Sequence, residues 1–117
     1  MSAQPIQANP PDIYGQISDA RLAVQVVIDE LALPAPTIVA RPTVVHITVA
    51  DVDDLAQWVL ALGGEVRRGI ALDGASLWTL RTETPVRGNG STVAIRVHVP
   101  VVEGEDVIAF LYAAVTE

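Results

Sequence analysis

The sequence has 117 residues, the length of one domain, and its fourteen acidic and seven basic residues give a net charge of −7. All seven basic residues are arginines, and the acidity argues against nucleic-acid binding through phosphate contacts, which needs a basic surface. There is no cysteine, which excludes a disulfide, a thiolate metal site and a cysteine nucleophile.

Apolar residues make up 50% of the sequence, the mean hydropathy is +0.40, and aromatic residues contribute only 4%. We therefore expect a core of aliphatic side chains, with apolar surface left over for a homodimer interface. No apolar run approaches the roughly 20 residues of a membrane span. Residues 1–11 also lack the basic residues of a signal peptide, so we expect a cytoplasmic protein.

Residues 1–11 are predicted to form a flexible, proline-containing arm, and residues 12–117 a single α+β domain. Residues 12–33 are predicted to form a helix, with Asp12 as its N-cap and Pro34 ending it. The apolar positions of this helix recur near the helical period, at Ile13, Ile17, Val24, Val27 or Ile28, and Leu31.

Residues 37–50 contain the first predicted strand, whose main part begins near Thr43, after Pro42. A second helix is predicted over residues 51–62, because Asp51 is a good N-cap and Gly63 a good helix end. Its buried side is predicted to consist of Val52, Leu55, Val59 and Leu62, and we expect both tryptophans, Trp58 and Trp78, in the core.

Residues 65–72 and 75–83 alternate in polarity and are joined near Asp73-Gly74, which predicts a hairpin. Residues 92–100 predict a fourth strand, with Val93, Ile95, Val97 and Val99 facing the core. Residues 103–117 fit either a helix, which we favour, or a fifth strand. The predicted fold is an N-terminal helix followed by a βαβββ unit with a four-stranded mixed sheet.

One stretch of this unit resembles a known module. The run from His46 to Trp58, followed by Ala61-Leu62-Gly63-Gly64-Glu65-Val66, is similar to one βαβββ module of the vicinal oxygen chelate superfamily, the glyoxalase and bleomycin-resistance group. The likeness covers residues 44–100. It implies that the first and fourth strands pair in parallel, and that two modules, here from a dimer, form a cup for a metal or a small ligand. The layout of the whole chain also resembles small proteins of high-GC actinobacteria and their phages.

The polar face of the predicted sheet carries the candidate ligand-binding residues. If the first and fourth strands are neighbours, one face collects His46, Thr48, Arg67, Arg81, Arg96 and His98, together with Thr79. Imidazoles bind metals and arginines hold carboxylates or phosphates, so His46 and His98 are the candidate metal ligands. The alternative interpretation is an ordinary solvated sheet face, on which strand alternation alone places polar residues.

No nucleophile elbow or phosphate-binding loop occurs in the sequence, and no catalytic residues are predicted. We therefore predict a non-enzymatic interaction or accessory module, homodimeric, encoded by a phage or mobile element and acting on a host protein. It is predicted to need no cofactor and to stay off membranes. The second hypothesis is the metal- or ligand-binding cup with a divalent metal. The third is an acidic mimic of nucleic acid.

Overall fold

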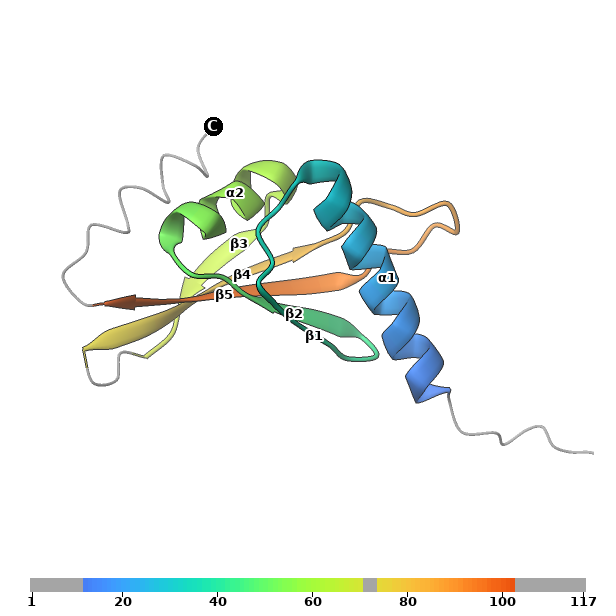
Figure 1. The fold of residues 1–117 in the computed structure, drawn as a ribbon, viewed down its shortest axis with the longest axis horizontal. Coiled ribbons are helices and arrows are strands. Elements are labelled where there is room, and N and C mark those ends of the chain that lie inside the picture. The colour runs from blue at the N-terminus through green and yellow to red at the C-terminus, as the bar shows by residue number, and fades with distance from the viewer. Residues whose placement is uncertain (1–11, 71–73, 103–117) are drawn as a thin grey trace, which may run out of the picture.

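The computed structural model describes residues 12–70 and 74–102, and within these residues two helices and a five-stranded mixed sheet are present (Figure 1). This confirms the α+β class and the N-terminal helix. In chain order the elements are α1 (Ile13–Leu31), β1 (Thr37–Ala40), β2 (Val44–Thr48), α2 (Val52–Leu62), β3 (Glu65–Arg68), β4 (Ala75–Glu83) and β5 (Ala94–Val102). The strands lie in the order β1-β2-β5-β4-β3. Neither described helix is long and apolar enough to cross a membrane.

Helix α1 begins where the sequence predicts, because the Asp12 carboxylate accepts a hydrogen bond from the Gly15 backbone N–H at 2.9 Å. Its buried residues are Ala20, Val24, Val27 and Ile28. The predicted apolar side is therefore wrong at both ends, where Ile13 and Leu31 are exposed. Figure 1 shows the reason at the N-terminal end, since the first turns of α1 extend beyond the sheet.

The predicted first strand is in fact two strands, which corrects the strand number from four to five. Strand β1 runs antiparallel to β2, with Thr37 opposite Thr48 and Ala40 opposite Val45. The chain reverses between them at Pro42, whose ring cannot donate to a sheet ladder, and a 2.8 Å hydrogen bond from Arg41 N to Val44 O closes the turn. The added strand forms one edge of the sheet.

Helix α2 has the predicted bounds. Asp51 caps it by accepting from the Asp54 N–H at 3.0 Å, and Gly63 follows it with φ of +70°, a conformation that favours glycine. Trp58 is fully buried, as predicted, and its indole N–H donates to the Pro34 carbonyl at 2.8 Å. This bond ties α2 to the segment that follows α1, so the two helices are held over one sheet.

The remaining strands follow the predicted order. Strands β3 and β4 form the predicted antiparallel hairpin, although β3 ends at Arg68 and Ile70 is exposed rather than in the strand. Strand β5 is antiparallel to β4 and parallel to β2, as the module resemblance implied. Residues 71–73, which were expected in this hairpin, lie outside the described residues, as do the predicted N-terminal arm and the C-terminal segment 103–117.

Both helices lie on one face of the sheet, where α1 contacts β1 and β2 and α2 contacts β4 and β5. The core lies between these two layers. The alternation predicted for the last strand is confirmed, and that strand and its neighbours contribute buried Val45, Ile47, Leu80, Val93, Ile95, Val97 and Val99. Trp78 is half-buried and packs against this core. No described helix covers the opposite face, which we call the open face.

Candidate functional site: the open face of the sheet

The register of the strands arranges the open-face side chains in two neighbouring rows across the sheet. One row runs from β1 to β3 through Val39, His46, Arg96, Arg81 and Glu65. The next row runs through Thr37, Thr48, His98, Thr79 and Arg67. Directly paired residues on neighbouring strands have Cβ atoms about 5 Å apart, so the side chains within a row interact.

Two histidines form the centre of this face. His46 Nδ1 and His98 Nε2 lie 3.0 Å apart, the ring centroids are 5.3 Å apart, and the ring planes differ by 15°. The centroid separation equals the N···N distance plus the distance from each nitrogen to its ring centre. The two nitrogens therefore face each other along one line, and the rings meet edge to edge in an N–H···N hydrogen bond.

This hydrogen bond continues to a third side chain, because His98 Nδ1 lies 2.9 Å from Thr79 Oγ1. In the hydrogen-bonded row Thr79–His98–His46, either partner of each contact can be the donor. At the His–His contact, however, one of the two facing nitrogens must be unprotonated in order to accept. Burial lowers the pKa of His98 below its ordinary value, and the neighbouring His46 and Arg96 lower it further. These surroundings therefore favour the neutral form of His98.

Two arginines stand beside the histidines as direct cross-strand partners. Arg81 on β4 is opposite Arg96 on β5, and Arg96 is in turn opposite His46 on β2. Arg96 is half-buried and donates to the adjacent Ile95 carbonyl at 3.1 Å. Among the described residues no carboxylate lies within ion-pair distance of either guanidinium. Like charges placed opposite each other destabilise a sheet, so the Arg81–Arg96 contact is unfavourable in the free protein, and Glu65, opposite Arg81 on β3, offsets part of this cost.

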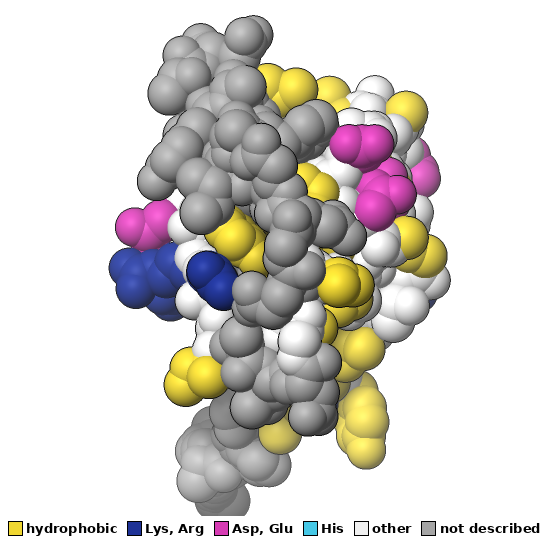
Figure 2. Space-filling view, turned by 90° about the vertical axis from the view of Figure 1, so that its left-hand side faces the viewer, with side chains coloured by type: hydrophobic (Ala, Val, Ile, Leu, Met, Phe, Trp, Pro, Cys, Tyr) yellow, Lys and Arg dark blue, Asp and Glu magenta, His cyan; other side chains and the backbone are white. Residues whose placement is uncertain are grey.

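The outer strand of this face carries an ion pair of its own. Arg67 Nε and Glu65 Oε1 are 2.8 Å apart on exposed side chains. The hydrogen bond and charge of Arg67, with a smaller contribution from Arg81, hold the pKa of Glu65 below its usual value. Arg67 is thus partly neutralised. Figure 2 shows arginine side chains gathered on one side of the molecule, whereas most visible acidic side chains lie on the opposite side.

All six predicted site residues lie on the same sheet face, because they alternate with the buried residues of their strands. His46, Arg96 and His98 are half-buried, and Thr48, Arg67 and Arg81 are exposed. Among the described residues, no three histidine, aspartate or glutamate side chains lie close enough together to hold one metal ion. A metal shared by the two histidines would also require one ring to turn, since lone pairs that face each other do not converge on a third point.

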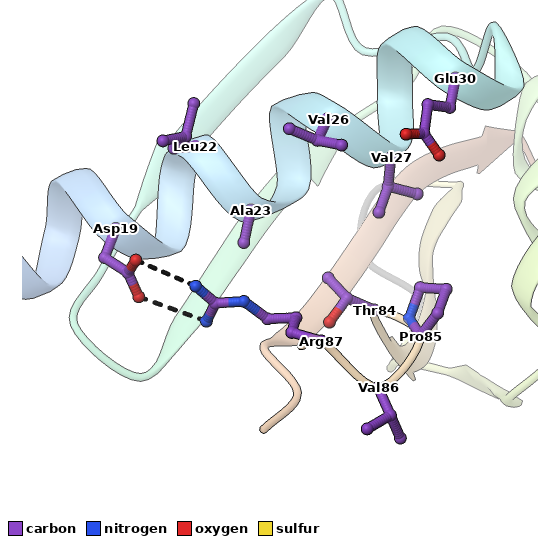
Figure 3. A pocket seen from close by; sticks show the side chains of 10 residues that line it. All are labelled: Asp19, Leu22, Ala23, Val26, Val27, Glu30, Thr84, Pro85, Val86 and Arg87. Atoms are coloured by element: carbon purple, nitrogen blue, oxygen red, sulfur yellow. Dashed lines mark hydrogen bonds and ion pairs between the residues drawn. The ribbon is translucent and has the colours of Figure 1, made fainter. Parts of the chain in front are cut away.

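A second surface feature was not predicted from the sequence. A groove of about 320 Å³ lies between α1 and the segment that follows β4 (Figure 3). Arg87 crosses its end and forms a two-point ion pair with Asp19, with Nη2–Oδ1 at 3.0 Å and Nη1–Oδ2 at 3.3 Å. Leu22, Val26 and Val86 line the groove and are exposed. These residues are far apart in sequence, so no local pattern joins them.

Comparison with known proteins gives no match to any protein-family model, curated protein or solved structure. The resemblance of residues 44–100 to a vicinal oxygen chelate module stays a prediction. The parallel pairing of β2 with β5 agrees with that module, but it defines a strand arrangement and not a family.

Proposed function

We propose that this protein is a non-enzymatic interaction module whose open sheet face binds an acidic segment of another protein. The observation that carries the proposal is the opposed pair Arg81 and Arg96, which forms no ion pair with a carboxylate among the described residues. A guanidinium pair of this kind is costly alone and favourable when a carboxylate lies between the two groups.

The surroundings of the arginine pair fit a protein segment better than an isolated ion. The open face is a sheet surface on which exposed Val39 and Leu77 lie around the charged centre. An acidic segment with apolar side chains would contact both kinds of surface. Arginine suits such contacts, since its planar fork holds a carboxylate at two points.

The net charge of −7 does not oppose this binding at physiological ionic strength. The Debye length there is about 8 Å, so distant acidic residues are largely screened, and nearby groups dominate. The two glutamates on the strands of this face are both engaged, Glu65 with Arg67 at 2.8 Å and Glu83 with the Thr92 hydroxyl at 3.3 Å. Three arginines, Arg67, Arg81 and Arg96, outnumber the two glutamates on the strands of this face, so its net charge is positive although the whole molecule is acidic.

The contacts of His98 favour a structural role for this side chain over general-base catalysis. His98 uses both ring nitrogens in contacts within the protein, one to His46 and one to Thr79. A general base needs a nitrogen directed at the substrate, within hydrogen-bond reach of the proton it removes. We infer that the pair orders the centre of the face and keeps the neighbouring arginine side chains in place.

The direct test is fluorescence anisotropy with a short labelled peptide in which glutamate alternates with leucine. Arg81→Gln and Arg96→Gln should each weaken binding about tenfold, because each removes one charge-assisted contact. Arg21→Gln is the matched control, since Arg21 is an exposed arginine on α1 and gives the same change in net charge. Equal losses in all three variants would overturn the proposal, because binding would then follow total charge alone.

The cup hypothesis predicts a different result on the same face. A ligand of that kind would be a small anion, and inorganic phosphate would raise the melting temperature in the wild type but not in Arg81→Gln. A divalent metal would do so in the wild type but not in His46→Ala. Either result without peptide binding would favour the cup over the acidic segment.

A further inference from the structure

We propose that two copies of this chain form a two-fold symmetric dimer in which the α1 helices pack antiparallel beside the groove between α1 and the β4–β5 loop. This interface uses residues of α1 and of that loop only, so it does not depend on what the open face binds. A symmetric dimer requires a surface that is complementary to itself. The surface beside the groove carries an exposed apolar pair with charges of both signs around it, which are the elements that such an interface needs.

The apolar part of the surface is a pair of side chains one turn apart on α1. Leu22 is 64% exposed and Val26 is also exposed, while Val86 on the facing loop is 72% exposed. Figure 3 shows Leu22 and Val26 side by side on the outer side of α1, with Val86 on the far rim of the groove. Exposed aliphatic side chains grouped in this way are typical of contact surfaces.

The charged residues of the groove lie at its two ends. Asp19 and Arg87 mark one end and Glu30 marks the other, eleven residues along α1 from Asp19 and so roughly 16 Å away. If Leu22 of one α1 helix lies opposite the partner's Val26, the two-fold axis crosses the helix pair at the level of residue 24. The same axis places Glu30 within about one residue of the partner's Asp19–Arg87 pair, at 1.5 Å of helix rise per residue.

The guanidinium of Arg87 has donors left for this contact. It has five N–H groups, of which two donate to Asp19 and one donates to Ser91 Oγ at 3.4 Å. The remaining two have no hydrogen-bond partner among the residues that the structure describes, and they can accommodate a second carboxylate. In the dimer Glu30 of the partner subunit supplies that carboxylate, so each Arg87 joins one carboxylate of its own chain and one of its partner.

Sedimentation velocity of the full chain over a concentration series tests the dimer. The wild type should sediment as a dimer at high concentration, and Leu22→Asp should raise the dissociation constant by at least about tenfold, because two carboxylates enter an apolar contact. Leu60→Asp is the matched control on α2, where Leu60 is 60% exposed. A wild type that stays monomeric, or a dimer that Leu22→Asp leaves unchanged, would overturn the proposal.

Cross-linking tests the antiparallel register independently of folding stability. The chain has no cysteine, so single-cysteine variants report one position each. A mixture of Leu22→Cys and Val26→Cys chains should oxidise to the mixed disulfide faster than either variant oxidises with itself, and the two chains differ in mass. Leu60→Cys should remain reduced under the same conditions. A Leu60→Cys rate equal to that of the mixture would exclude the α1 interface.

Discussion

The two faces of the sheet show how the same five strands perform two different tasks. The helix-covered face is mainly aliphatic, and its central side chains, such as Leu80 and Val97, are fully buried. The open face carries histidine, threonine and arginine at the alternate positions of the same strands, as Thr79 and His98 illustrate. The covered face thus stabilises the fold, while the open face carries two arginines, Arg81 and Arg96, that form no ion pair with a described carboxylate. This difference is the reason for proposing the open face as the binding surface.

The largest effect is expected at the indole that joins both helices to the sheet. Trp58→Ala should lower the free energy of unfolding by about 3–5 kcal/mol, because it empties a fully buried site. It also leaves the Pro34 carbonyl without its 2.8 Å hydrogen bond. Urea denaturation measures the change. Leu60→Ala, on the exposed side of the same helix, is the control and should cost less than about 1 kcal/mol.

A matched pair on one strand compares the two faces directly. Leu80 is fully buried on the covered face, and Leu77 is 47% exposed on the open face of the same strand, β4. Leu80→Ala should cost about 2–5 kcal/mol and Leu77→Ala about 1 kcal/mol or less. The urea midpoints of the two variants give the comparison. Similar losses in both would mean that the open face is packed like a core in solution.

Much of this two-faced arrangement was predictable, because the side-chain period of a strand is two. Alternation alone assigned Val93, Ile95 and Val97 to the core and His98 to the other face. The hairpin signal and the Asp51 cap predicted local structure in the same way, since each depends on a few consecutive residues.

Other features depend on contacts that no local pattern contains. The Asp19–Arg87 pair joins residues 68 positions apart, so the groove could not be predicted. The Arg81–Arg96 opposition requires the exact strand register, in which a slip by one residue reverses every side chain. The edge strand β1 was missed because Thr37–Ala40 and Val44–Thr48 read as one apolar stretch interrupted at Pro42. The helical period of α1 was visible, but not how far the sheet extends beneath it.

The histidine pair predicts that the open face loses stability in mild acid. Because the pKa of His98 is lowered in the folded protein, the unfolded chain binds more protons between that lowered value and about 6.5. The contribution of His98 is therefore complete above about pH 6.5 and declines as the pH falls through the window below it. If both facing nitrogens, His46 Nδ1 and His98 Nε2, carried a proton, two N–H donors would also lie face to face at the 3.0 Å contact.

Urea denaturation of the wild type and of His98→Gln at pH 7.5 and 5.5 measures this effect. Between pH 7.5 and 5.5 the free energy of unfolding should fall more in the wild type than in the variant. Subtracting the variant's change from that of the wild type removes the contribution of the carboxylates, which is common to both proteins. Glutamine keeps a hydrogen-bonding side chain next to Thr79 and does not titrate. A pH dependence that is the same in both proteins would show that His98 is not buried against His46 in solution.

The smallest expected effect has the opposite sign and separates binding from stability. Arg96→Gln removes the positive charge beside Arg81 and His98, so it should raise the free energy of unfolding by a few tenths of a kcal/mol, up to about 1 kcal/mol at low salt. Arg21→Gln, at an exposed position of α1, should change stability by less. Screening should reduce the gain at high salt, which urea denaturation at two salt concentrations would show. Loss of stability in Arg96→Gln would mean that this guanidinium supports the fold, whereas a gain together with weaker peptide binding would identify a residue kept for its partner.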